Sequence, residues 1–118
     1  MSPDCLMFFS PYQKAKSSYI LLEESLMPDI SDMLVIVYDD HISFRGKSEF
    51  GGVWPVTGGD AVLDAYFILP APMDASRVTS VTEQAPGKFY HHVTIGGTAD
   101  VDEELLTWFR NAHDAINA

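Results

Sequence analysis

Two histidines of this chain lie in segments that share one pattern of residue types. The segments are His41-Ile42-Ser43-Phe44 and His92-Val93-Thr94-Ile95, and each consists of histidine, apolar residue, hydroxyl residue and apolar residue. On a β-strand, a residue and its second neighbour face the same side, so each histidine would share a face with a hydroxyl group. Two such strands side by side would place two imidazoles and two hydroxyls around one phosphate.

The pairing resembles the motif of the 2H phosphoesterase superfamily. The resemblance implies that His41 and His92 act as general base and general acid. It further implies that Ser43 and Thr94 contact the phosphate oxygens. A small phosphoesterase that cleaves a cyclic or 2'-5'-linked nucleotide is therefore one hypothesis for this chain.

The chain departs from that superfamily in three respects. Its 118 residues are few for a fold built from two such lobes, and Asp39 and Asp40 precede the first histidine where the family prefers an apolar residue. The net charge of -10 would also repel a phosphodiester. We therefore favour the interpretation that both histidines make ordinary hydrogen bonds on strands and that the chain has no catalytic residue.

The remaining motifs indicate neither a metal site nor a cofactor site. His91 and His92 are adjacent, so on a strand they would point to opposite faces and could not share a metal ion. Cys5 is the only cysteine, which excludes an intramolecular disulfide and favours a reducing cytoplasm. Residues 51–59 are rich in glycine but lack lysine and the spacing of a nucleotide-binding loop. His113 is interpreted as part of a solvated helix end.

The chain contains 17 acidic and 7 basic residues, and the acids are grouped along the sequence. The basic residues form no stripe that would bind a phosphate backbone or an anionic membrane, so no direct contact with nucleic acid or membrane is expected. No apolar run approaches the roughly 20 residues of a membrane-spanning helix, and the N-terminus lacks the basic region of a secretory signal. Two intervals contain acids and no base, and their acids are Glu23, Glu24, Asp29, Asp32, Asp39 and Asp40, then Glu49, Asp60, Asp64 and Asp74.

This distribution favours a small acidic protein that inhibits a basic protein partner, although acidity can also serve solubility alone. A nuclease active site is basic, so a carboxylate-rich surface can occupy it in competition with phosphate. The leading hypothesis is an immunity protein for a nuclease toxin or a phage-encoded inhibitor of a nucleic-acid-handling defence enzyme. The predicted contacts are Asp29, Asp32, Asp39 and Asp40, with Trp54 as the aromatic anchor. A third hypothesis is a structural or adaptor subunit that forms a homodimer through an unpaired sheet edge.

The first element expected along the chain is a helix. The segment Ser10-Pro11-Tyr12-Gln13 has the form of a capping box, and apolar residues at steps of three and four behind it predict a helix from about residue 11 to residue 27. The competing interpretation makes 6–9 and 19–23 two strands of a hairpin, because several residues of this region are weak helix formers. Cys5 is interpreted as a small apolar residue at a strand start.

The middle of the chain indicates strands. The run Met33-Leu34-Val35-Ile36-Val37-Tyr38 predicts a central strand covered on both faces, and residues 41–45 are expected to complete a hairpin with it. Residues 51–59 favour a long loop or an irregular edge that carries Trp54. The second half of 61–69 is expected to be a strand.

The C-terminal half predicts a second hairpin and a helix. Residues 76–83 and 88–95 flank a turn, and the second run alternates apolar and polar residues. A wide apolar stripe predicts a helix from about 101 to 116, capped by Asp100. The order of these elements indicates a single globular domain over 1–118, of α+β class, with a mainly antiparallel sheet of about four to six strands packed against an N-terminal and a C-terminal helix.

Overall fold

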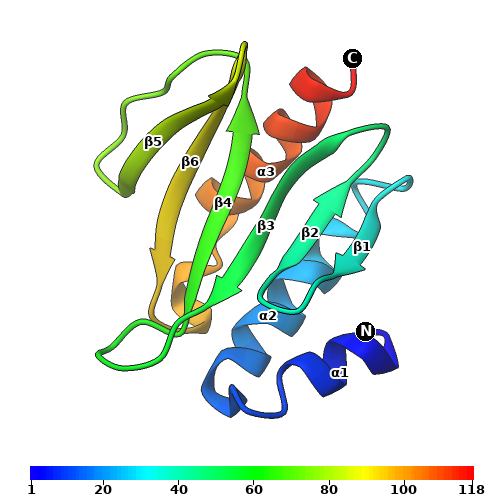
Figure 1. Ribbon diagram of the computed structural model, residues 1–118, viewed down its shortest axis with the longest axis vertical. Coiled ribbons are helices and arrows are strands. Elements are labelled where there is room, and N and C mark those ends of the chain that lie inside the picture. The colour runs from blue at the N-terminus through cyan, green and yellow to red at the C-terminus, as the bar shows by residue number, and fades with distance from the viewer.

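The computed structural model describes residues 1–118, which form one antiparallel sheet and a set of helices (Figure 1). The helices are α1 (Pro3–Phe8), α2 (Gln13–Leu26), the 3-10 helix η1 (Thr98–Asp100) and α3 (Glu103–Ile116). The strands are β1 (Leu34–Val37), β2 (Ile42–Arg45), β3 (Glu49–Pro55), β4 (Leu63–Leu69), β5 (Val78–Ala85) and β6 (Lys88–Ile95). The six strands have the order β1-β2-β3-β4-β6-β5. The predicted α+β class is confirmed.

The helices lie on one side of the sheet. In Figure 1, α2 and α3 lie behind the strands, where α3 contacts β3 and β4 and α2 contacts β4. No helix covers the opposite side, which we call the open face. None of the helices combines the length and the apolar character that a bilayer crossing requires.

The N-terminal region is helical and contains no strand. Helix α2 confirms the predicted helix, while the alternative hairpin of 6–9 and 19–23 is wrong. Helix α1 was not predicted from the sequence. Its N-cap is Ser2, whose side-chain oxygen accepts a hydrogen bond from the backbone nitrogen of Cys5 at 3.3 Å, and a proline follows at the first helical position. Cys5 therefore lies buried inside a helix and not at a strand start.

The start of α2 differs from the predicted capping box. The N-cap residue is Tyr12, which makes no side-chain capping bond. Gln13 is the first helical residue, and its Nε2 donates to the carbonyl oxygen of Ser10 at 2.9 Å. The proline of this segment therefore lies in the turn between the two helices, where its fixed φ and missing N–H are tolerated.

Strand β1 is an edge strand, so the predicted central position of the run 33–38 is wrong. It pairs with β2 alone, which confirms the hairpin with 41–45. Leu34 is 57% exposed, and the other residues of β1 are half-buried. A continuous apolar run therefore predicts a strand but does not distinguish an edge strand from a central one.

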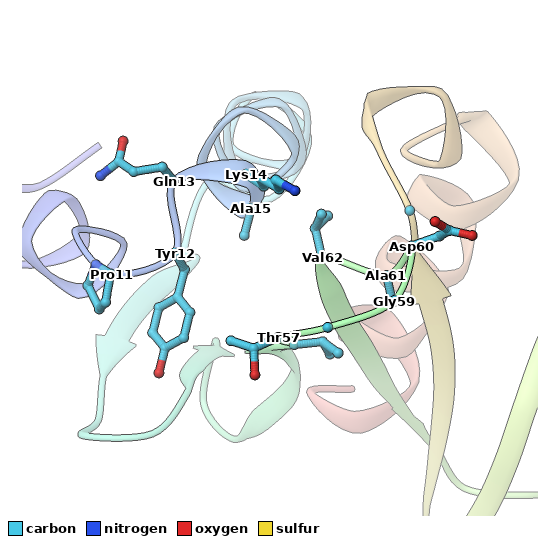
Figure 2. Close-up of a pocket in the computed structure, with 13 residues that line it drawn as sticks. Pro11, Tyr12, Gln13, Lys14, Ala15, Thr57, Gly59, Asp60, Ala61 and Val62 are labelled. Carbon is cyan, nitrogen blue, oxygen red and sulfur yellow. The ribbon is translucent and has the colours of Figure 1, made fainter.

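Strand β3 occupies the interior of the sheet, between β2 and β4, where a loop or irregular edge was predicted for 51–59. That prediction is wrong for 51–55 and correct for the residues that follow, which form the connection to β4. A Cβ atom on Gly51 would lie 2.6 Å from Cε1 of Phe109, so glycine lets α3 pack directly on this strand. The connection to β4 faces the start of α2 across a hollow (Figure 2).

The remaining strand predictions are confirmed. Strand β4 includes the expected second half of 61–69, and β5 and β6 form the expected hairpin. Gly87 has a φ of +73° in its turn, which glycine adopts without strain. His91 and His92 point to opposite faces as predicted: the ring of His91 stacks on Phe67 on the helix side, with centroids 5.1 Å apart, and His92 lies on the open face.

Helix α3 confirms the predicted C-terminal helix, but its predicted cap is wrong. Asp102 is the N-cap, and its carboxylate accepts a hydrogen bond from the backbone nitrogen of Leu105 at 3.0 Å. Asp100 lies in η1, where its carboxylate accepts from the backbone nitrogen of Gly96 at 2.8 Å. Acid residues in the first turn of α3 complement the positive end of the helix dipole.

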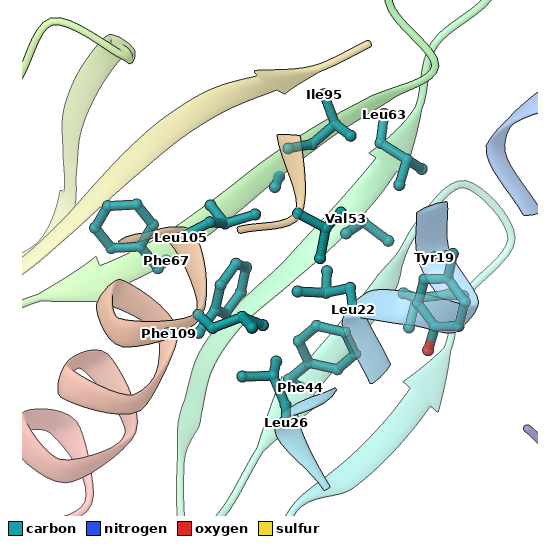
Figure 3. Packing of buried hydrophobic residues seen from close by; sticks show 14 of the residues in the cluster. Tyr19, Leu22, Leu26, Phe44, Val53, Leu63, Phe67, Ile95, Leu105 and Phe109 are labelled. Carbon is teal, nitrogen blue, oxygen red and sulfur yellow. The ribbon is translucent and has the colours of Figure 1, made fainter. Parts of the chain in front are cut away.

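The apolar core lies between the helices and the sheet (Figure 3). Leu22 and Leu26 of α2 enter it from one side and Phe109 of α3 from the other. The Phe109 ring centroid lies 5.9 Å from that of Phe44 and 6.0 Å from that of Phe67. Truncating a fully buried phenylalanine to alanine costs about 3–5 kcal/mol, so this contact is a principal source of stability.

Candidate functional site on the open face

The open face of the sheet is hollowed over its central strands. The hollow has a volume of about 390 Å³, and its lining residues are His41, Glu49, Trp54, Asp64, Tyr66, Gln84, Tyr90 and His92. We call it the open-face hollow. Trp54 faces Asp64 in the β3–β4 ladder, and Tyr66 faces His92 in the β4–β6 ladder. Because paired residues of neighbouring strands share a face, the antiparallel register places these side chains together.

One carboxylate of this arrangement, that of Glu49, is bound by hydroxyl groups, and Arg45, its partner in the β2–β3 ladder, does not line the hollow. Glu49 Oε2 accepts hydrogen bonds from Ser43 Oγ at 2.7 Å and from Tyr66 Oη at 2.8 Å. Glu49 Oε1 accepts from Tyr90 Oη at 2.9 Å. No lysine or arginine lines the hollow, so hydroxyl groups supply the hydrogen bonds to this carboxylate.

The two tyrosines are held in their protonated form. Burial raises the pKa of Tyr66, and the charge of Glu49 and the hydrogen bond to it raise this pKa further. Burial, the hydrogen bond to Glu49 and its charge raise the pKa of Tyr90 to about 12. A neutral hydroxyl that donates to an ionised carboxylate stabilises the negative charge, so the floor of the hollow is anionic.

Glycine at position 52 makes room for this floor. Gly52 faces Tyr66 across the β3–β4 ladder, and a Cβ atom there would lie 2.5 Å from the Tyr66 hydroxyl oxygen. The tyrosine ring therefore lies across β3 and reaches Glu49. The two consecutive glycines of β3 serve the two faces of the sheet, because Gly51 makes the corresponding room for Phe109 on the helix side.

Both histidines of the hollow are hydrogen-bonded to aspartates. His92 Nδ1 lies 3.0 Å from Asp64 Oδ2, and His41 Nδ1 lies 2.7 Å from Asp40 Oδ1. In each pair, the carboxylate fixes the orientation of the imidazole and leaves Nε2 for an external partner.

An aromatic stack forms one wall of the hollow. The His41 ring lies between Tyr38 and Trp54, with centroid distances of 4.8 Å and 4.3 Å and nearly parallel planes. Trp54 remains 37% exposed. Stacking of this kind holds the indole in place without burying it, which is what a preformed binding surface requires.

The structure distributes the predicted partner contacts over two regions. Trp54 lines the open-face hollow, Asp40 is hydrogen-bonded to the lining residue His41, and the exposed Asp39 precedes Asp40 in the β1–β2 turn. Asp29 and Asp32 are bound to residues of α3. The Asp29 carboxylate lies 2.8 Å from Nε of Arg110, and the Asp32 carboxylate lies 2.8 Å from Nε2 of His113.

The environment of His113 differs from the predicted solvated helix end. Its side chain is 18% exposed, and its ring packs edge-on against Phe50 with centroids 5.1 Å apart. Its second ring nitrogen lies 3.1 Å from Asp114, so both nitrogens contact carboxylates. The helix sequence alone does not indicate this environment, because Phe50 belongs to β3 and Asp32 to the α2–β1 connection.

Of the four residues of the phosphoesterase motif, only the two histidines line the open-face hollow. His41 and His92 both line the open-face hollow, and each ring lies within 6.4 Å of the Tyr66 ring centroid. Ser43 is 1% exposed and its hydroxyl is committed to Glu49. Thr94 is exposed and is not among the lining residues. The histidines therefore meet at one site, while the hydroxyls do not.

Several residues of the site were not singled out from the sequence. Asp64 and Tyr66 are second neighbours on β4, and Tyr90 and His92 are second neighbours on β6. Each pair therefore shares a face of its strand, which the sequence indicates once both segments are assigned as strands. Glu49 carried no signal of its own, because its role depends on three hydroxyls that lie far from it along the chain or on the neighbouring strand.

A second, larger hollow of about 710 Å³ separates the start of α2 from the β3–β4 connection (Figure 2). It contains one base, Lys14, and one acid, Asp60, and includes none of the predicted site residues. The open-face hollow is therefore the stronger candidate. Comparisons of the chain with protein-family models, curated proteins and solved structures give no match.

Proposed function

We propose that the chain is a small acidic binding protein that neutralises a basic protein partner through the open-face hollow. The proposed classes are an immunity protein for a nuclease toxin and a phage-encoded inhibitor of a nucleic-acid-handling defence enzyme. The observation that carries this proposal is the Glu49 carboxylate, which lies in an aromatic hollow without a lysine or arginine lining it. A cationic side chain of a partner would supply the missing countercharge.

The surroundings of the hollow support the same partner chemistry. Asp64 adds a second carboxylate to the lining, Asp40 is hydrogen-bonded to the lining residue His41, and Asp39 precedes it in the β1–β2 turn. With a net charge of -10, the chain would attract a basic surface over long range and accelerate association. Trp54 supplies an exposed aromatic side chain of the kind that anchors protein interfaces.

The proposal also specifies a location. An inhibitor of a nuclease is needed where the nucleic acid lies, and a chain with a single cysteine needs no oxidising compartment. We place the activity in the cytoplasm.

Paired charge-removal variants test the proposal. In Glu49→Gln/Asp64→Asn the two carboxylates of the hollow become amides, and in Glu24→Gln/Asp74→Asn the same charge is removed from two exposed positions. We expect affinity capture from the source cell to retain a basic protein on the wild-type chain and on the control, but not on the hollow variant. Retention should also weaken steeply with salt.

The captured protein then needs a functional readout. The captured protein is purified and its enzymatic activity is assayed. This activity should be inhibited by the wild-type chain and by Glu24→Gln/Asp74→Asn, but not by Glu49→Gln/Asp64→Asn. Equal inhibition by both variants, or a partner without a basic surface, would contradict the proposal.

A phosphoesterase is the second candidate, because His41 and His92 meet in one hollow with both Nδ1 atoms on carboxylates. Two observations weigh against it: Glu49 would repel a phosphate, and Ser43 is buried. This candidate predicts hydrolysis of a cyclic or 2'-5'-linked nucleotide that is lost in His41→Ala and in His92→Ala. An absence of hydrolysis by the wild-type protein would remove it.

A further inference from the structure

We infer that the open-face hollow binds an arginine side chain of the basic partner, with its guanidinium stacked on Trp54 and hydrogen-bonded to Asp64. This inference rests on the proposed function and names the group that is recognised. It follows from three features of the hollow: the free acceptor capacity of its carboxylates, the position of its indole, and the absence of a lining lysine or arginine.

Asp64 is the carboxylate with the most acceptor capacity left. Its Oδ2 accepts from His92, whereas Glu49 already accepts three hydroxyl hydrogen bonds. A carboxylate offers about four lone-pair directions, so Glu49 has roughly one left and Asp64 about three. Asp64 would therefore accept the guanidinium N–H groups, and Glu49 would contribute mainly its charge.

Trp54 lies beside this carboxylate. The two residues are directly paired in the β3–β4 ladder, which places their Cβ atoms about 4.5–5.5 Å apart on the same face. One side of the indole is stacked on His41, and the side chain remains 37% exposed. A flat cation that stacks on the exposed part of the ring would therefore lie close to the Asp64 carboxylate.

These features select arginine over lysine. A guanidinium is planar, stacks on aromatic rings and donates a fork of N–H groups to a carboxylate. An ammonium group is a strongly hydrated point charge that cannot stack in this way. A neutral aromatic ligand would leave the carboxylates of the hollow without a countercharge.

Fluorescence of Trp54 provides a direct test. The variant Trp108→Phe leaves Trp54 as the only tryptophan, and phenylalanine preserves a ring next to Phe67. Titration with acetyl-Gly-Arg-Gly-amide should change the Trp54 emission in a saturable manner. We expect acetyl-Gly-Lys-Gly-amide to bind about tenfold more weakly.

Two further variants, made in the Trp108→Phe protein, test whether Asp64 is the carboxylate that binds the guanidinium. Asp64→Asn should weaken binding of the arginine peptide by about tenfold, while Glu24→Gln, at an exposed position of α2, should leave it unchanged. Equal binding of the two peptides, no saturable change with either, or an unchanged affinity in Asp64→Asn would each overturn the inference.

The outcomes separate this inference from the proposed function. If a basic partner is captured and inhibited through the hollow but the arginine peptide does not bind, the proposed function stands and the arginine assignment is wrong. If the arginine peptide binds as expected but no basic partner depends on Glu49 and Asp64, the hollow is a guanidinium site and the inhibitor assignment is wrong.

Discussion

Gly52 and Tyr66 face each other across the β3–β4 ladder, and a Cβ atom on residue 52 would lie 2.5 Å from the Tyr66 hydroxyl oxygen. The same atom would also overlap the carbonyl oxygen of Ile42. The absence of a side chain at this position therefore allows Tyr66 to cross β3 and donate to Glu49. The floor of the open-face hollow depends on one glycine.

The variant Gly52→Ala should destabilise the protein and disturb the hollow. Since the obstructing carbonyl belongs to the backbone, relief requires movement of a strand, and overpacking of this kind costs about 1–3 kcal/mol. Gly97→Ala is the control, because its backbone is extended and a Cβ atom added there would have no other atom within 4 Å. Urea denaturation should show a change below about 0.5 kcal/mol for the control. Equal stability of the two variants would refute the steric argument.

Removal of the Glu49 charge should make Tyr90 easier to ionise. Burial, the hydrogen bond to Glu49 and its charge raise the pKa of Tyr90 to about 12, above the ordinary value of 10.0. In Glu49→Gln the charge disappears while most of the burial remains, so this pKa should fall part of the way toward its ordinary value. Spectrophotometric titration of tyrosinate measures the change, and Glu24→Gln is the control at an exposed position.

The same pKa implies a loss of stability at alkaline pH. Above pH 10.0 the tyrosine of the unfolded chain ionises, while folded Tyr90 stays protonated until about pH 12. The unfolded state therefore binds fewer protons in this window, and the free energy of unfolding falls as pH rises through it. The fall should be shallower in Glu49→Gln, and identical profiles would show that Glu49 does not set the pKa of Tyr90.

His91 should make the fold sensitive to mild acid. It is fully buried, its Nδ1 donates to the carbonyl oxygen of Phe89, and its Nε2 accepts from the backbone nitrogen of Met73, both at 2.9 Å. Burial lowers the pKa of His91 below its ordinary value of 6.5. Below pH 6.5 the unfolded chain gains a proton that the folded chain resists, so stability is complete above this pH and falls as pH decreases toward the folded pKa.

The variant His91→Phe isolates this contribution. Phenylalanine preserves a ring against Phe67 but leaves the Met73 amide without its acceptor, which should cost about 1–3 kcal/mol at neutral pH. The acid-induced loss of stability should nevertheless be smaller than in the wild-type protein, because the other three histidines are present in both proteins. Parallel stability profiles between neutral pH and about pH 5 would show that His91 does not contribute.

The elements that could be predicted are those whose signals are local. The C-terminal helix carries a cap, acidic residues in its first turn and a continuous apolar stripe, and all three lie within one segment. The hairpin of β5 and β6 was likewise marked by a turn centred on Gly87. Such signals involve only neighbouring residues, so they predict the element independently of its tertiary contacts.

The sequence-based predictions were wrong where the reason for a residue type is a contact with a residue far away in the sequence. Gly51 and Gly52 indicated a loop, but they lie in an interior strand because Phe109 and Tyr66 pass over it on its two faces. The Glu49 floor of the open-face hollow was not predicted for the same reason, since Glu49 meets its tyrosine partners only after the strands are ordered. Strand order is set by the tertiary fold and leaves no periodic trace in one sequence.

Arg77 should stabilise the junction between the β4–β5 connection and α3. Its Nη1 donates to the carboxylates of Asp102 at 2.8 Å and Glu104 at 3.0 Å, and its Nη2 donates to the carbonyl oxygen of Asp100 at 2.8 Å. Arg77→Lys keeps the charge but loses the fork of donors, so the free energy of unfolding should fall by about 1–2 kcal/mol. Arg45→Lys, which changes an arginine that forms no ion pair, should alter stability by less than about 0.5 kcal/mol in the same urea titration. Lysine keeps the charge of arginine, so a loss of stability in Arg77→Lys can come only from the fixed geometry of the guanidinium. If both variants had the same free energy of unfolding as the wild-type protein, the hydrogen bonds of Arg77 would contribute nothing to stability beyond its charge.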